Sequence, residues 1–311
     1  MTTATGPVSP AGSAGPVGVV GVVGTENPGS RGATGGGMPG GKSGRPWLAH
    51  LILMPTALVF AAPLVWMALT AFMPDTDINR YPPRVWPSHF TLAGFARIFT
   101  EDDYPRWLMN TVLVSAVAVA GHLVLCSLAG YGFARLRFRG RTLTFALVMA
   151  TVMVPAQVLM IPTFLMFRNL GLIDTLGAAF VPWLASAFGV FLMRQFFLSL
   201  PRELEEAATI DGCSRLGVFF RIVLPLARPA LATLTVFTLL GAWNDLIWPL
   251  IAISSEDTYT LQMGLATFAG ARHTEWSALM AGNLVATLPL VAAFILAQRH
   301  FVATMSFSGL K

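Results

Sequence analysis

The sequence predicts an all-α membrane protein with six transmembrane helices. Of its 311 residues, 55% are hydrophobic and only 11% are charged, whereas a soluble domain usually carries about 25% charged residues. The mean hydropathy is +0.66. Six apolar stretches each come close to the roughly 20 residues that a helix needs to cross a bilayer. We expect these spans at about 47–73, 108–133, 142–167, 176–197, 229–251 and 278–298.

Residues 1–46 differ in kind from the six-span region 47–311. They are mainly Gly, Pro, Ser, Thr and Val, so they cannot bury a core, and we expect a disordered cytoplasmic tail. Within them, Gly36–Ser43 matches the phosphate-loop pattern GxxxxGKS. Such a loop works only between a buried strand and a helix N-terminus. A glycine-rich coil flanks this copy, so we interpret the match as a coincidence.

Basic residues predict how the spans are oriented, because cytoplasmic loops carry an excess of Lys and Arg. The short link between the second and third spans holds Arg135, Arg137, Arg139 and Arg141. If this link is cytoplasmic, so are both chain termini and the segment 201–225. The net charge of +5 then reflects loop placement, with membrane lipid and not nucleic acid as the partner.

Two long links are expected on the outer side, at 74–107 and 252–277. Loops of this length are usually functional or disordered. We expect the second link to contact an extracytoplasmic partner.

The segment 201–225 is the longest charged stretch between two apolar runs. Pro201 suits the first position of a helix, and Gly212 can take the left-handed conformation that ends one. The helix dipole stabilises negatively charged side chains in the first turn of a helix. The acidic residues at this position are Glu203, Glu205 and Glu206. The sequence therefore predicts one short helix before Gly212.

A second short helix is predicted after this turn. Ser214 is suited to cap it, and Pro225 is expected to end it. An apolar stripe at helical spacing is expected to hold this helix against the membrane, and it is formed by Leu216, Phe219, Phe220 and Val223.

The same segment carries a spaced motif, EAA-x3-G-x9-I-x-LP, which begins at Glu206 and ends at Pro225. This motif resembles the EAA loop of ABC-importer membrane subunits, which docks on the cytoplasmic ATPase. The alternative is an amphipathic helix lying on the bilayer without a partner, but that leaves the Ala-Ala pair and the Gly break without a purpose. The resemblance implies a set of ATPase-coupling residues, namely Glu206, Ala207, Ala208, Asp211, Gly212, Ile222, Leu224 and Pro225.

Further stretches, among them Leu128–Phe138 and Trp243–Leu250, are similar to the carbohydrate-importer branch of these permeases, and in particular to the smaller subunit of the maltose type. The resemblance implies the MetI-like ABC importer permease fold in the bacterial plasma (inner) membrane. It also implies a second permease subunit, two ABC ATPase subunits and a solute-binding lipoprotein outside. ATP and Mg²⁺ would bind the ATPases, and no cofactor would bind this chain. Two departures from the family pattern are Thr304 in the tail and Cys213 in the docking turn.

Within the motif, Glu206 is the best candidate to pair with a basic group of the ATPase. Ala207, Ala208 and Gly212 are candidates for close steric contact. Asp211 serves equally well as a docking residue or as a cap of the turn.

Polar residues within the spans are the candidates for a translocation path, because an ionisable group at membrane depth is a functional candidate by default. Asn244 and Asp245, with Trp248, suit sugar hydroxyls and rings, and Gln157 lies between two prolines. The alternative for Asn244 and Asp245 is a hydrogen bond between helices or a contact with the second permease. For His122 we favour a packed hydrogen-bonding group over a proton relay.

No catalytic arrangement is evident, so we expect a transport subunit and not an enzyme. The two cysteines, Cys126 and Cys213, imply neither a disulfide nor a metal framework. An intramembrane enzyme and a structural or receptor protein are the alternatives from other classes. Within transport, the alternative is an importer subunit for a polyamine, phosphate or a peptide.

Overall fold

The computed structural model describes residues 46–82, 84–100, 102–270 and 274–308, and the side chains of these ranges except 46–49, 52 and 297–308. The chain divides into two units after Leu53, within helix α1 (Pro46–Ala71). Most of the predicted tail, including the phosphate-loop match, lies outside the described residues, as does the side chain of Thr304. The description below concerns residues 54–311.

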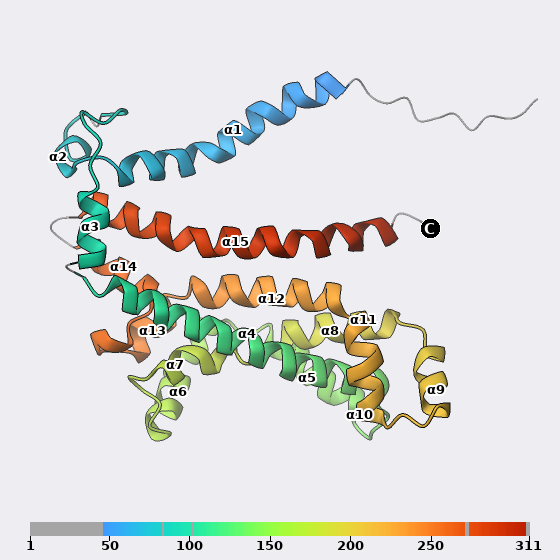
Figure 1. The fold of residues 1–311 in the computed structure, drawn as a ribbon. Coiled ribbons are helices and arrows are strands. Elements are labelled where there is room, and N and C mark those ends of the chain that lie inside the picture. Colours follow the sequence, from blue (N-terminus) through green and yellow to red (C-terminus); the bar gives the residue numbers. More distant parts are fainter. Residues whose placement is uncertain (1–45, 83, 101, 271–273, 309–311) are drawn as a thin grey trace, which may run out of the picture. The chain divides into compact units, whose positions relative to one another are not determined.

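The described residues form helices and turns, with a single isolated β-bridge between Ala269 and Thr274 (Figure 1). The all-α prediction is therefore confirmed. After α1 the elements are α2 (Asp75–Ile78), α3 (Ala93–Thr100), α4 (Tyr104–Arg135), α5 (Arg141–Thr151), α6 (Ala156–Asn169), α7 (Leu176–Phe180), the 3₁₀ turn η1 (Val181–Trp183), α8 (Ala187–Ser199), α9 (Glu203–Ile210), α10 (Arg215–Val218), the π-turn η2 (Phe219–Val223), α11 (Leu224–Leu226), α12 (Arg228–Trp243), α13 (Ile247–Ala252), the 3₁₀ turn η3 (Glu256–Thr258), α14 (Leu261–Thr267) and α15 (Trp276–Ser308).

By length and composition, four stretches of the described chain can each cross a membrane: Leu53–Ala71, Tyr104–Arg135, Leu176–Ser199 and Trp276–Leu296. Two bent helix pairs raise this number to six if each pair is one span. One pair joins α5 to α6 with a bend of 100°, and the other joins the stretch Arg215–Leu226 to α12 with a bend of 76°.

Three of the six expected spans are not single α-helices. The span expected at 176–197 consists of α7, the 3₁₀ turn η1 and α8. The span expected at 142–167 breaks between Thr151 and Ala156, where Pro155 cannot donate a helical hydrogen bond. The span expected at 229–251 breaks after Trp243 and resumes as α13. At this second break the Asp245 side chain accepts the backbone N–H of Trp248, which satisfies a free donor in the first turn of α13.

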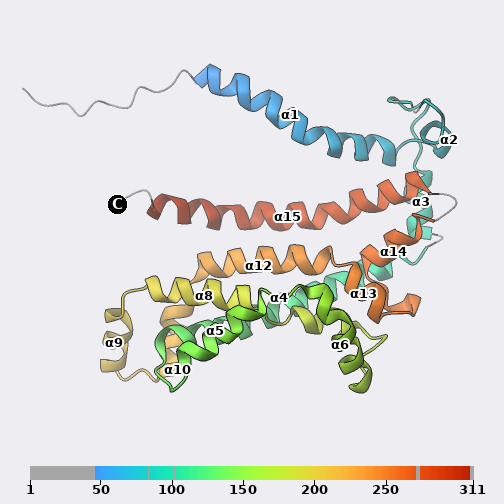
Figure 2. The same ribbon diagram turned by 180° about the vertical axis from the view of Figure 1, so that it is seen from behind.

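The long helix α4 is the centre of the packing. It contacts α8 and α12, and α12 in turn contacts α15 (Figures 1 and 2). Gly130 permits the close approach of α4 to α8, since a Cβ atom there would lie 2.7 Å from the Cβ of Met193 and 2.9 Å from the backbone nitrogen of Arg194.

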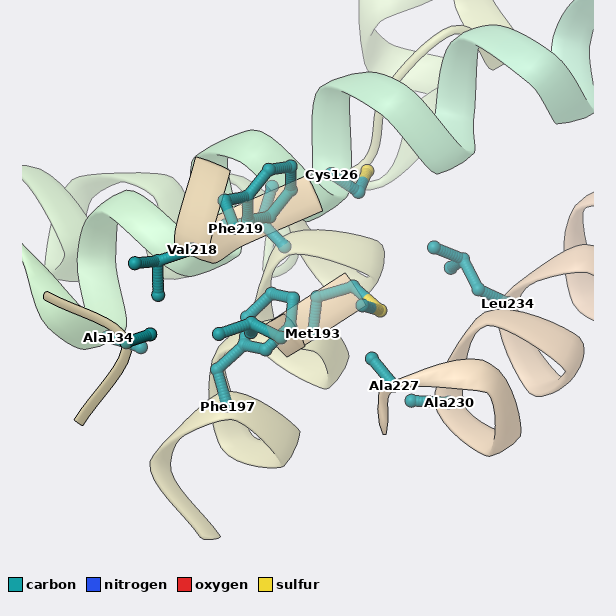
Figure 3. Packing of buried hydrophobic residues seen from close by; sticks show 12 residues of the cluster. Cys126, Ala134, Met193, Phe197, Val218, Phe219, Ala227, Ala230 and Leu234 are labelled. Carbon is teal, nitrogen blue, oxygen red and sulfur yellow. The ribbon is translucent and has the colours of Figure 1, made fainter. Parts of the chain in front are cut away.

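One apolar cluster joins α4, α8 and α12 to the segment 201–225 (Figure 3). Its fully buried members include Phe197 of α8 and Phe219 of η2. A second cluster lies where α3, α14 and the first residues of α15 meet the beginning of α4 around Tyr104 and Trp107. The segment 201–225 is thus built into the packed core of the span region and does not hang from it as a free loop.

Hydrogen bonds order both links that were expected on the outer side. In the first link, the backbone and the hydroxyl of Ser88 donate to Asp77 Oδ2, and these bonds, with Arg84 nearby, lower the pKa of Asp77. In the second, Asn110 of α4 donates to the carbonyls of Asp257 and Tyr259, both at 2.9 Å. Each of these links is therefore held by specific polar side chains.

Candidate functional site

The segment 201–225, called the docking segment below, begins with α9. Its helix starts at Glu203 after the cap residue Arg202, so the start predicted at Pro201 was two residues too early. Gly212 ends the turn with φ +86°, as predicted. The N–H of Cys213 bonds back to the carbonyl of Ala208 at 2.9 Å, which is the hydrogen bond of a Schellman cap.

The second half of the docking segment is only partly as predicted. Ser214 caps α10, and its hydroxyl accepts the N–H of Gly217 at 3.2 Å. The helix continues through the π-turn η2 and ends at Leu226, beyond the end predicted at Pro225. A π-turn has more residues per turn than an α-helix, and the predicted stripe accordingly splits: Phe219 and Val223 are buried, whereas Leu216 and Phe220 are more than half exposed.

The predicted coupling residues fall into two groups. Glu206, Ala207, Asp211 and Gly212 are exposed, and so is Pro225. The remaining three face inward, where Ala208 is 5% exposed within the apolar cluster. The two further inward residues, Ile222 and Leu224, pack against the same cluster.

Sequence reasoning missed a set of apolar side chains on the surface of the docking segment. They are Leu204, Ile210, Leu216 and Phe220, of which Ile210 is 87% exposed. Exposed apolar residues grouped on one segment are typical of an interaction site. Their signal in the sequence was the presence of large apolar residues in the most charged part of the chain.

Sequence reasoning also missed an ion pair behind α9. Glu205 Oε1 lies 2.6 Å from Arg135 Nε, and the Tyr131 hydroxyl donates to Glu205 Oε2 at 2.9 Å. Tyr131 and Arg135 are four residues apart on α4, a spacing that places them on one helix face. From the sequence, that spacing could have suggested that Tyr131 and Arg135 bind the same partner side chain.

A cavity of about 570 Å³ lies among α4, α6, η1 and the break between α12 and α13. Asn244 and Asp245 line it, together with His122 and Trp183. Trp183 Nε1 donates to Asp245 Oδ2 at 3.0 Å, which links η1 to the fifth-span break. The structure thus brings three of the four predicted path residues, Asn244, Asp245 and Trp248, to one cavity that also holds Trp183.

Trp248 and Gln157 have surroundings that differ from those of Asn244 and Asp245. Trp248 also lines the cavity but is only 8% exposed. Its Nε1 donates to the carbonyl of Ala178 at 2.9 Å, and its ring meets Phe167 edge-on. Trp248 therefore anchors α13 more than it offers a stacking face. Gln157 is exposed and is not among the cavity-lining residues.

His122 is a satisfied hydrogen-bonding group. Its Nδ1 lies 2.7 Å from the carbonyl of Trp183, which can only accept, so Nδ1 carries the proton. Its Nε2 then accepts from the Ser186 hydroxyl at 3.1 Å, while Ser186 Oγ accepts the N–H of Gly189. This arrangement fits the packed hydrogen-bonding role favoured from the sequence.

Within the described ranges, no group of three or more His, Cys, Asp or Glu side chains is placed to hold a metal ion. Cys126 and Cys213 are both free thiols. The expectation that this chain carries no cofactor stays a prediction.

Comparison with known proteins identifies relatives along most of the chain. The family model of binding-protein-dependent transport system inner membrane components matches residues 122–307. The arabinooligosaccharide transport permease AraQ of Halalkalibacterium halodurans is 37% identical over 85% of this chain and 96% of its own length. The lactose transport permease LacG of Rhizobium radiobacter is 34% identical over 82% of this chain and 93% of its own.

A solved structure shares the fold. It is a bacterial ABC transporter involved in the import of the acidic polysaccharide alginate, and one of its chains superposes with a TM-score of 0.72 at 25% identity, covering 82% of this chain and 96% of that one. This likeness confirms the predicted MetI-like permease fold. The chain belongs to the binding-protein-dependent transport system inner membrane components, and it is a permease subunit of an ABC importer.

Proposed function

We propose that this permease imports a sugar or an oligosaccharide and forms the translocation path together with a second permease. The observation that carries the proposal is the docking segment, which presents Glu206 and Ala207 outward beside exposed apolar side chains while its inner face is fixed in the core. The names of the relatives, which specify arabinooligosaccharides and lactose, support a carbohydrate as the substrate.

In the proposed mechanism, two ATPase subunits bind ATP and Mg²⁺ and close, and the docking segments of the two permeases move together. The cavity then opens outward to receive the solute. The docking segment is the element through which nucleotide and solute bias one equilibrium, and each ligand can shift that equilibrium only by its differential affinity for the two states.

The proposed assembly contains this chain, a different permease, two ABC ATPases and an external solute-binding lipoprotein. It places both termini and the docking segment in the cytoplasm. The arginines of the link between α4 and α5 support this orientation, because that link and the docking segment adjoin each other through Arg135 and Glu205. The second outer link, folded as η3 and α14, is the proposed contact for the lipoprotein.

The cavity beside Asp245 is the proposed contribution of this chain to the path. Asn244 is exposed at the break between α12 and α13 and donates to the carbonyl of Leu240. The Asp245 carboxylate and the Asn244 amide supply acceptors and a donor suited to sugar hydroxyls, within walls that are mainly apolar.

The proposal is tested by affinity purification of the chain from its native host in mild detergent, with mass spectrometry of the partners. We expect one ATPase, one different permease and one lipoprotein. The lipoprotein is then screened for binding against sugars, a polyamine, phosphate and peptides.

Binding of a sugar by the recovered lipoprotein supports the proposed substrate class. Binding of a polyamine, phosphate or a peptide instead overturns that class but not the importer assembly. Recovery of an ATPase without a second permease contradicts the heterodimer, and recovery of no ATPase from intact complexes contradicts the docking role of residues 201–225.

A further inference from the structure

We propose that Glu205, Arg135 and Tyr131, called the coupling cluster below, transmit movement of the docking segment into α4 and α8. The inference rests on the proposed function and deepens it. It assigns positioning residues behind the docking surface, none of which has to touch the ATPase, the nucleotide or the sugar.

The coupling cluster joins three elements through one ion pair and two hydrogen bonds. Arg135 of α4 reaches Glu205 of α9 at 2.6 Å and donates through Nη2 to the carbonyl of Leu200, just beyond α8, also at 2.6 Å. The Tyr131 hydroxyl donates a hydrogen bond to the second oxygen of the Glu205 carboxylate at 2.9 Å. Both oxygens of the carboxylate are therefore engaged by α4.

Burial distinguishes Glu205 from the other acids of α9. The Glu205 side chain is 18% exposed and that of Arg135 is 6% exposed, whereas Glu203 and Glu206 are exposed. Separating a buried ion pair leaves a desolvated charge without a partner, which is strongly unfavourable. A displacement of α9 therefore carries the end of α4 with it in preference to breaking the pair.

Packing extends this connection beyond the ion pair. The Tyr131 ring meets Phe197 of α8 at 5.8 Å and Phe219 of η2 at 5.0 Å between centroids. The adjacent residue, Gly130, lies directly against Met193 of α8. The coupling cluster is thus seated where α4 and α8 approach closely, and the two helices receive the same displacement.

The far end of this connection is the cavity. The helix α4 is continuous from Tyr104 to Arg135, and His122, which lines the cavity, lies about 20 Å from Arg135 along the helix at 1.5 Å per residue. His122 Nδ1 is hydrogen-bonded to the backbone carbonyl of Trp183, and the indole N–H of Trp183 donates to Asp245 Oδ2. A shift of α4 along or about its axis at the docking segment therefore reaches the polar wall of the cavity.

The test uses the complete transporter in proteoliposomes and measures sugar transported per ATP hydrolysed. Glu205→Gln and Arg135→Gln each remove one charge of the pair. We expect each to lower this ratio by about fivefold or more, the lower bound of typical coupling between sites. Glu203→Gln removes the same charge from an exposed position of the same helix and is expected to leave the ratio unchanged.

A purely structural ion pair predicts a different result. The single variants would then lower the melting temperature and the yield of complex while the surviving complexes keep the wild-type ratio, and this result overturns the inference. The double variant Arg135→Met with Glu205→Leu removes both charges and leaves neither unpaired, which typically restores stability. We expect its ratio to stay low, and recovery of the wild-type ratio contradicts a coupling role for the pair.

Failure of the proposed function looks different from either result. In that case the complex with the unaltered chain would itself transport no sugar while its ATPase subunits hydrolyse ATP, whichever residues stand at positions 135 and 205. If sugar transported per ATP hydrolysed is low only in the variants, the effect is due to the coupling cluster.

Discussion

At the scale of single residues, Asp174 shows how one carboxylate can fix a long link. It lies between α6 and α7 with φ +61°, and its Oδ1 accepts the N–H groups of Ser254 and Ser255 at 2.8 Å each. The Ser255 hydroxyl donates to Oδ2. These bonds lower the pKa of Asp174 from 3.8 to about 2, so the ionised form stabilises the fold.

The sign of the pH dependence follows from that shift. The stabilisation by ionised Asp174 is complete above about pH 4 and is lost as the pH falls through about 2. In detergent, the melting temperature of the wild type should therefore fall over this range more steeply than that of Asp174→Asn. Asn tolerates the left-handed backbone, so it isolates the charge, while Asp174→Ala should be the less stable variant at neutral pH. Parallel curves for wild type and Asp174→Asn would contradict the prediction.

The two adjacent alanines of the docking segment have opposite environments, because Ala207 is exposed and Ala208 is 5% exposed in the core. Ala208→Leu should overpack the cluster and cost about 1–3 kcal/mol of stability. Ala207→Leu should change stability by less than about 0.5 kcal/mol but hinder ATPase binding by its bulk. Thermal unfolding and co-purification separate the two effects, and equal destabilisation by both variants would show that this placement is wrong.

At the scale of elements, the docking segment depends on one backbone conformation. Gly212 holds φ +86°, and a Cβ atom at this position would meet nothing within 4 Å. Any effect of a substitution there on the stability of this chain is therefore due to the backbone. Gly212→Ala should cost about 1–2 kcal/mol, the usual penalty for an L-residue in a left-handed conformation.

The control for this prediction is Gly212→Asn, which tolerates positive φ and should retain most of the stability. Thermal unfolding of the two variants measures the difference. An alanine variant as stable as the wild type would show that the turn relaxes without loss.

Those parts of the docking segment that depend on near neighbours could be predicted from the sequence. The Gly212 turn and the Ser214 cap are determined within a few residues, and both are confirmed. The π-turn could not be predicted, because it is selected by tertiary packing of Phe219 and Val223 in the core. Tyr131 and Glu205 are 74 residues apart, and no local pattern specifies that pair.

The same limit applies to the spans. Apolar length located them, with Pro155 inside the span expected at 142–167 and Asn244 inside the span expected at 229–251. It could not show that the chain bends by 100° near Pro155, or that Asp245 bonds to Trp183 and the backbone of Trp248 at the fifth-span break. These features depend on which helices become neighbours.

At the scale of the whole molecule, docking should depend on a charge that contributes little to the fold of this chain. Glu206 is exposed in the first turn of α9, and no hydrogen bond or ion pair of its side chain is found among the described residues. Glu206→Gln should lower the stability of this chain by about 1 kcal/mol at most, the contribution of an exposed acid to the helix dipole, and weaken ATPase binding by about 2–5 kcal/mol, the usual cost of truncating one partner of a buried interfacial charge pair. Pull-down of the ATPase at several salt concentrations measures this effect, and unchanged retention would exclude Glu206 from the interface.

The apolar cluster behind the docking segment also has a consequence for synthesis. It takes Met193 and Phe197 from before that segment, and Ala230 and Leu234 from after it (Figure 3). A nascent chain that has just emerged through Pro225 therefore still lacks part of the surface on which its docking helices fold. The surface proposed to bind the ATPase should therefore be complete only after α12 has been inserted, and a chain truncated before α12 should present no finished site for an ATPase.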